Sequence, residues 1–150
     1  IDRYLFYPES MYDLIPFSNL SHINKKNDVD SSFLRLLGKR SKKDWCSYYQ
    51  EAALASQKGE WDQAMQIGHI AFDEHHLQPK QAAELFPFIE GYAHGGNWRK
   101  AQDLTIQAYD LSRTSRSGLC ALWKRIKQSD VAPKQKIYLE VRQWLSCEIG

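Results

Sequence analysis

The sequence predicts an all-α domain made of antiparallel helix pairs, about six helices in all, preceded by an irregular N-terminal arm. The main observation is an internal repeat: GEWDQA at residues 59–64 returns as GNWRKA at residues 96–101, a shift of 37 residues. The same shift relates Ala71 to Ala108. A fixed period in the thirties is typical of helical repeats, in which each unit buries its apolar face against its neighbour.

The composition is that of a folded domain of ordinary size. The chain has 150 residues, of which 43% are apolar and 13% aromatic, enough to bury a core. Its formal net charge of +2 is too close to balance to indicate nucleic-acid binding. No apolar run reaches the roughly 18–20 residues of a membrane span, and no signal-peptide pattern is present. Because the chain opens with Ile1 rather than Met, we expect it to be part of a larger protein.

Residues 1–43 are predicted to form an N-terminal arm and basic linker that pack on the repeat. Residues 1–8 are aromatic and extended in character, residues 19–32 are polar and typical of a loop, and residues 38–43 form the basic linker. The aromatic side chains of the arm need a surface on which to bury, and the repeat is the nearest one.

Residues 44–150 are predicted to form the helical repeat domain, and its first unit covers about 45–79. Asp44 is a suitable N-cap for the first helix, and Gly59 is a suitable left-handed residue to end it. The second helix is expected to run over about 61–74, on the period of its apolar residues.

The second unit covers about 80–115, and a closing helix pair covers 116–148. Pro87 lies within the apolar pattern of the second unit's first helix, so it must either kink that helix or begin it. The second helix of this unit begins near Trp98. The closing pair lacks the Gly-x-Trp-x-x-Ala pattern, and we expect it to be a degenerate third unit or a cap.

Small residues stand where the backbones of paired helices would cross, at Ala52, Ala64, Ala71, Ala101 and Ala108, and Gly68 opens room for a close neighbour. Together with the turn at Gly59 and the closing Pro79, this pattern resembles the tetratricopeptide repeat over residues 45–113. The resemblance implies helix pairs whose first helices line a binding groove.

Several features depart from that family. The unit is longer than the usual 34 residues. Gly68 and Thr105 stand where a large apolar residue is typical, and Ile89 stands where Gly or Ala is typical.

Four segments carry a more specific resemblance: WCSYYQEAALA at residues 45–55, GEW at 59–61, PFIEGYA at 87–93 and GNW at 96–98. They are similar to the C-terminal tail region of large bacterial membrane proteins, the dolichyl-phosphate-mannose-type (family 39) glycosyltransferases and related hypothetical membrane proteins. The resemblance implies that the chain is the soluble, membrane-associated tail of a multi-span protein. The chemistry of that family belongs to its membrane part, so no catalytic residue is carried over. The side of the membrane stays open, and the alternative is a cytoplasmic, free-standing adaptor.

The tetratricopeptide template places a candidate groove on the first helices of the two units. Its candidate residues are Tyr49, Ala53, Gln57, Phe86, Glu90 and His94. Such a groove is aromatic and nearly neutral, which suits an apolar peptide, a partner helix or the chain's own N-terminal arm.

No catalytic motif is present: the sequence has no Gly-x-Ser-x-Gly elbow, P-loop or dinucleotide fingerprint, and no cofactor is expected. Glu84, Glu90 and Asp103 supply carboxylates near the second unit, and paired carboxylates can hydrolyse glycosides when correctly separated. Glu90 stands out in the apolar stretch 88–93. We expect it to face the groove or to pair with a nearby Arg or Lys, and a small enzyme centred on Glu90 and His94 is the alternative.

His69, Asp73 and His76 are spaced to share one helix face. A metal site needs three or four converging donors. This segment has no HExxH pattern and ends a helix near solvent, where the helix dipole favours histidine. We therefore expect a solvated helix end and no metal.

One basic block offers a candidate contact with an anionic surface, at Lys39, Arg40, Lys42 and Lys43. Membrane headgroups are one possible partner, since the resemblance puts the chain beside a membrane. A solvated linker is the simpler interpretation, and nucleic acid is the least favoured.

Cys46, Cys120 and Cys147 form neither a disulfide framework nor a zinc pattern, because they are odd in number and contain no CxxC pair. We interpret them as small buried or half-buried hydrophobic residues. One disulfide with a free thiol is the alternative if the domain lies outside the cytoplasm.

The sequence thus predicts a non-catalytic domain for protein interaction or structure. Its expected partner is a protein, a peptide or its own arm. The oligomeric state stays open.

Overall fold

The computed structural model describes residues 43–129 and 135–147. The chain divides after residue 42, and the unit that follows is the one described here. All regular structure in these residues is helical, which confirms the predicted all-α class. The predicted arm, apart from Lys43, lies outside the described residues.

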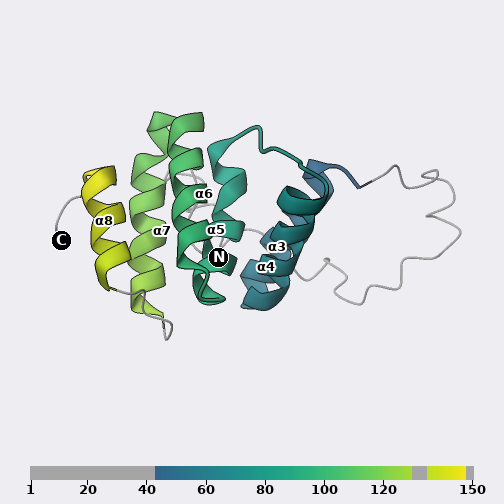
Figure 1. The fold of residues 1–150 in the computed structure, drawn as a ribbon, viewed down its shortest axis with the longest axis horizontal. Helices are drawn as coiled ribbons and strands as arrows, with labels where there is room; N and C mark the ends of the chain where they lie inside the picture. The colour runs from purple at the N-terminus through teal and green to yellow at the C-terminus, as the bar shows by residue number, and fades with distance from the viewer. Residues whose placement is uncertain (1–42, 130–134, 148–150) are drawn as a thin grey trace, which may run out of the picture. The chain divides into compact units, whose positions relative to one another are not determined.

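The helices follow one another with short connections and lie side by side, from α3 and α4 at one end of the row to α8 at the other (Figure 1). In chain order the elements are α3 (Trp45–Lys58), α4 (Trp61–His69), the π-helical turn η3 (Ile70–Glu74), the 3-10 turn η4 (Ala82–Leu85), α5 (Phe86–His94), α6 (Trp98–Leu111), the 3-10 turn η5 (Arg113–Ser115), α7 (Arg116–Gln128) and α8 (Gln135–Leu145).

The 37-residue repeat of the sequence is also a repeat of backbone hydrogen bonds. Gly59 and Gly96 both have a left-handed backbone, with φ of 73° and 78°. The amide of Glu60 donates to the carbonyl of Ala55 at 2.9 Å, and 37 residues later the amide of Asn97 donates to Tyr92 at 2.8 Å. This arrangement ends a helix by satisfying its last carbonyls. Each of the two turns therefore stops one helix and starts the next at a tryptophan.

The helix starts also follow from local chemistry. Asp44 caps α3 as predicted, because its Oδ1 accepts a hydrogen bond from the amide of Ser47 at 3.0 Å. Pro87 is the second residue of α5, which begins at Phe86 directly after η4. The structure is therefore closer to the alternative in which Pro87 begins the helix, since a first-turn amide needs no helical acceptor.

Glycines let α4 and α5 approach closely. A Cβ atom added at Gly91 would lie 2.9 Å from the Cβ of Ala64 and 3.1 Å from the backbone nitrogen of Met65. A Cβ atom at Gly68 would lie 3.0 Å from the rings of Phe88 and Tyr92. The predicted role of Gly68 is thus confirmed, and Gly91 is a second close-contact position.

Helix α5 occupies the centre of the domain, because it contacts α3, α4, α6 and α7. Helix α8 contacts α7 and α6. The largest fully buried side chains are Trp123, Phe88, Leu85, Ile89, Leu119, Leu122 and Ile126, which come from η4, α5 and α7. Helix α7 therefore belongs to the same core as η4 and α5.

The two tryptophans of the repeat differ in environment. Trp98 is buried, but Trp61 is only half-buried. The indole of Trp61 stacks on the imidazole of His94, with ring centroids 4.1 Å apart and planes 7° from parallel. Trp61 thus covers the end of α5 from the side and does not fill the core.

Tyr92 provides a test of this packing. Its ring is 4% exposed, and its hydroxyl has no hydrogen-bond partner among the described residues. Burial, with a smaller contribution from the charge of Asp73, raises the pKa of Tyr92 to about 12. Because a buried, unpaired hydroxyl is destabilising, Tyr92→Phe is expected to raise the free energy of unfolding by about 1 kcal/mol at neutral pH, measured by urea denaturation.

The pH dependence provides an independent readout of the same variant. Between pH of about 10 and 12 the unfolded tyrosine loses its proton while the folded one keeps it, so the wild type loses stability as pH rises. Tyr92→Phe should lose less over that range. A variant that is less stable than wild type by more than about 1 kcal/mol at neutral pH would show that the hydroxyl is paired.

Candidate functional site

The predicted groove residues come from two neighbouring helices, α3 and α5. Tyr49, Ala53 and His94 are half-buried, and Gln57 is exposed. Phe86 and Glu90 are buried, with Glu90 only 5% exposed. The structure therefore brings the two helices together, but it places two of the six side chains in the interior.

Glu90 is a buried carboxylate held in an ion pair with a partly exposed arginine. Its two carboxylate oxygens accept hydrogen bonds from Arg125, one from Nε at 2.6 Å and one from Nη2 at 2.8 Å. The hydroxyl of Ser56 also donates to Glu90 Oε2 at 3.3 Å. These three residues belong to α5, α7 and α3, so one carboxylate connects three helices. Of the two roles expected for Glu90, pairing with a nearby arginine is the one that the structure shows.

His94 lies beside this ion pair. Burial lowers the pKa of His94, the charge of Glu90 opposes that effect, and the charge of Arg125 adds to it. With its ring stacked on Trp61, the imidazole is placed to be neutral near physiological pH. The cavity described below includes neither Glu90 nor His94.

The other two predicted carboxylates have separate roles. Glu84 Oε2 accepts hydrogen bonds from the indole nitrogen of Trp45 at 2.7 Å and from the amides of Lys80 and Gln81 at 2.8 and 3.2 Å. It thereby joins the start of the second unit to α3. Asp103 is exposed on α6. The three carboxylates of Glu84, Glu90 and Asp103 therefore have different surroundings and do not form one site.

The histidine-rich segment forms an exposed charge cluster. His69 Nδ1 lies 2.8 Å from Asp73 Oδ2, and Lys100 Nζ lies 3.1 Å from Asp73 Oδ1. The hydrogen bond from Lys100, followed by that from His69, lowers the pKa of Asp73 against the opposing effect of burial. His76 has a left-handed backbone with φ of 51°. Over residues 43–129 and 135–147, no group of three or more His, Cys, Asp or Glu side chains is arranged to hold a metal ion.

The predicted basic block is described at one position only. Lys43 forms an ion pair with Glu51 at 2.8 Å, and its ammonium lies 5.3 Å from the centre of the Tyr48 ring. Lys39, Arg40 and Lys42 lie outside the described residues. The charge of Lys43 is thus already paired with Glu51 of the adjacent helix α3.

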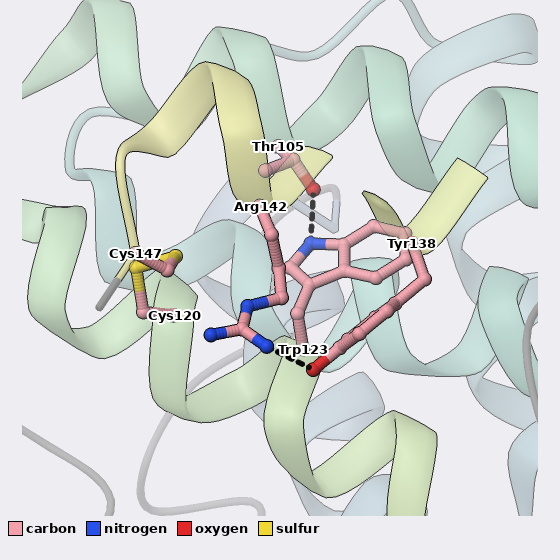
Figure 2. The surroundings of a disulfide bond; sticks show 6 residues. All are labelled: Thr105, Cys120, Trp123, Tyr138, Arg142 and Cys147. Atoms are coloured by element: carbon pink, nitrogen blue, oxygen red, sulfur yellow. Dashed lines mark hydrogen bonds between the residues drawn. A yellow bond between two sulfur atoms is a disulfide. The ribbon is translucent and has the colours of Figure 1, made fainter. Parts of the chain in front are cut away.

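Two of the three cysteines form a disulfide, Cys120 in α7 with Cys147 just after α8, with Cα atoms 5.7 Å apart (Figure 2). Cys46 is an exposed free thiol. The interpretation of all three as isolated hydrophobic residues is therefore wrong, and the alternative of one disulfide with a free thiol holds. No sequence pattern favours this pair of cysteines over the other two pairs, because their proximity depends on how α8 packs on α7.

Trp123, which lies on α7 as Cys120 does, is fully buried, and its indole nitrogen donates a hydrogen bond to Thr105 Oγ1 at 3.0 Å (Figure 2). The Thr105 hydroxyl in turn donates to the carbonyl of Ala101 at 2.7 Å. Thr105 departs from the tetratricopeptide pattern, which favours a large apolar residue. The departure has a physical cause, since the buried indole N–H needs an acceptor.

An open cavity of about 720 Å³ lies between α7 and α8, next to the disulfide. It is lined by Arg116, Ser117, Cys120, Ala121, Lys124, Lys127, Gln128, Tyr138, Arg142, Ser146 and Cys147. Sequence reasoning missed this site. The sequence pattern that could have indicated it is the spacing of Arg116, Cys120, Lys124 and Lys127. These residues follow one another every three or four positions and so lie on one face of a helix.

Comparisons with known proteins found no match from which the fold or the site could be interpreted: the chain matches no protein-family model, no curated protein and no solved structure. Within the described residues, none of the helices is both long enough and apolar enough to cross a membrane.

The disulfide is expected to stabilise the closing helix pair. It joins cysteines 27 residues apart, so the double variant Cys120→Ser/Cys147→Ser should lower the free energy of unfolding by roughly 3–4 kcal/mol, measured by urea denaturation. Cys46→Ser is the matched control and should change stability by less than about 0.5 kcal/mol, since Cys46 is exposed. Equal stability of the wild type with and without a reducing agent would contradict the pairing.

Proposed function

We propose that the chain is a non-catalytic helical-repeat domain of tetratricopeptide type, which acts in protein interaction or as a structural module. The observation that carries this proposal is the junction at Glu90, where side chains from α3, α5 and α7 meet. In repeat arrays the first helices of successive pairs lie next to one another and form one continuous face. Helices α3, α5 and α7 are the first members of three successive pairs.

The contacts of the closing pair support its interpretation as a degenerate third unit. Helix α7 packs on α5 as α5 packs on α3, and α8 reaches α6, the second helix of the preceding pair. Three pairs meet the usual minimum for a stable array, which two pairs alone would not.

The proposed binding surface is the face of α3 and α5 that carries Tyr49, Ala53, Gln57 and His94. It presents aromatic and small side chains with little net charge, which suits an apolar peptide or the chain's own N-terminal arm. Because Phe86 and Glu90 are buried, we assign them to the support of this surface and not to contact with a partner.

We further propose that the domain is the soluble tail of a multi-span membrane protein of glycosyltransferase type, on the strength of the sequence resemblance. The disulfide between Cys120 and Cys147 favours an oxidising compartment, and so the outer side of the membrane. The reading frame that precedes Ile1 in the gene distinguishes this proposal from a free-standing adaptor. A coding region for several apolar helices supports the tail, and its absence supports the adaptor.

Deletion of residues 1–17 tests the proposed partner. If the arm fills the groove, the deletion should lower the melting temperature by at least about 5 °C and increase the binding of a hydrophobic dye. A synthetic peptide of residues 1–17 added in trans should restore the melting temperature, and a scrambled peptide of the same composition should not. Unchanged melting would reject the arm as the partner and favour an external peptide.

A further inference from the structure

The cavity between α7 and α8 collects positive charge. Four of its lining residues are cations: Arg116, Lys124 and Lys127 from α7 and Arg142 from α8. Its lining contains no Asp or Glu, and its other polar side chains are Ser117, Gln128, Tyr138 and Ser146. In the part of the chain that the structure describes, Arg116, Lys124 and Lys127 form no salt bridge. Because like charges gathered in one cavity repel one another, an anion bound there would reduce the repulsion among these cations.

Tyr138 brings two of these cations together. Lys127 Nζ lies 4.9 Å from the centre of the Tyr138 ring, and the guanidinium of Arg142 lies 5.5 Å from the same ring. Arg142 Nη1 also donates to the Tyr138 hydroxyl at 3.3 Å (Figure 2). The ring is 4% exposed and packed against the core, so it holds the two cations from different helices at one place.

The charge of this region differs sharply from that of the rest of the domain. Residues 112–150 contain eight Lys or Arg and three Asp or Glu, although the whole chain has a net charge of only +2. Residues 44–111 contain four Lys or Arg and ten Asp or Glu. The positive field is therefore concentrated at α7 and α8, where it can attract an anion selectively.

We propose that the cavity between α7 and α8 is a binding site for a phosphate-bearing anion, either a soluble phosphate compound or the headgroup of an anionic phospholipid. A phosphate group carries up to two negative charges and at least three acceptor oxygens, which suits cations and hydroxyls that approach from two walls. A carboxylate has one charge and two acceptor oxygens and would leave several of these donors unused. The cavity volume of about 720 Å³ is within the usual range for small-ligand sites.

The disulfide prepares this site. Cys120 and Cys147 both line the cavity and connect its two walls covalently. A site whose walls are fixed before binding loses less conformational entropy when the ligand enters. This assignment is independent of the face of α3 and α5 proposed above to bind a peptide, so either can fail without the other.

Titration calorimetry of the oxidised, full chain with inorganic pyrophosphate tests the proposal. We expect binding at one site, with an affinity that falls as the salt concentration rises. The variant Lys124→Gln/Lys127→Gln should weaken binding by at least about tenfold, since it removes two charge-assisted contacts from an exposed part of α7.

The matched control is Lys58→Gln/Lys136→Gln. It removes the same net charge from exposed positions outside the cavity and should change the affinity less than about twofold. Equal weakening by the two double variants would overturn the site in favour of a general charge effect. Absence of pyrophosphate binding by the wild type at low salt, or equally tight binding of a polyglutamate peptide, would also overturn it.

Co-sedimentation with vesicles distinguishes the two sources of phosphate. Binding to phosphatidylglycerol vesicles but not to phosphatidylcholine vesicles, with release by pyrophosphate, supports a lipid headgroup as the ligand. Pyrophosphate binding without vesicle binding supports a soluble phosphate compound. Vesicle binding that is unchanged in Lys124→Gln/Lys127→Gln, in the absence of any pyrophosphate binding, would place the membrane contact elsewhere and reject the proposed site.

Discussion

Glu90 places a negative charge in the interior of the helical domain, where it must be paired to be tolerated. The transfer of a carboxylate out of water costs several kcal/mol, and this cost is offset only by well-placed partners. Arg125 supplies two hydrogen bonds in a planar arrangement, and Ser56 supplies a third contact. Because the partners come from α7 and α3, the charge of one side chain constrains how three helices are arranged.

The features of the closing pair follow from the placement of α7. Arg125 is directed at Glu90, and the neighbouring residues Trp123 and Ile126 of α7 are buried in the core. The indole nitrogen of Trp123 donates a hydrogen bond to Thr105 of α6. The opposite face of the helix then carries Arg116, Cys120, Lys124 and Lys127 to the side where α8 packs. The disulfide and the cationic cavity both lie on that side. The phosphate site that we propose thus depends on the ion pair between Arg125 and Glu90, which is made at the other face of α7.

Local features of this fold could be predicted from the sequence, and contacts between distant residues could not. The 37-residue period located the turns at Gly59 and Gly96 and the starts of α4 and α6, because helix caps are set by a few neighbouring residues. The choice between the two roles of Pro87 required the position of the preceding turn. The Glu90 partner was predicted by type but not by number, since any Arg or Lys could have packed there. The pairing of Cys120 with Cys147 and the cavity were missed because each needs two helices to be placed together.

A double-mutant cycle on Glu90 and Arg125 tests whether this ion pair organises the three helices that it joins. The free energy of unfolding is measured by urea denaturation for the wild type, Glu90→Gln, Arg125→Gln and the double variant. Arg125→Gln should cost about 3 kcal/mol, since it leaves the Glu90 carboxylate buried without its partner, and Glu90→Gln should cost less, because the Arg125 side chain is partly exposed to water. The double variant should be more stable than the sum of the single changes implies, with a coupling of roughly 1–3 kcal/mol. Additive effects, with a coupling below about 0.5 kcal/mol, would show that the helices are arranged by apolar packing alone and not by the ion pair.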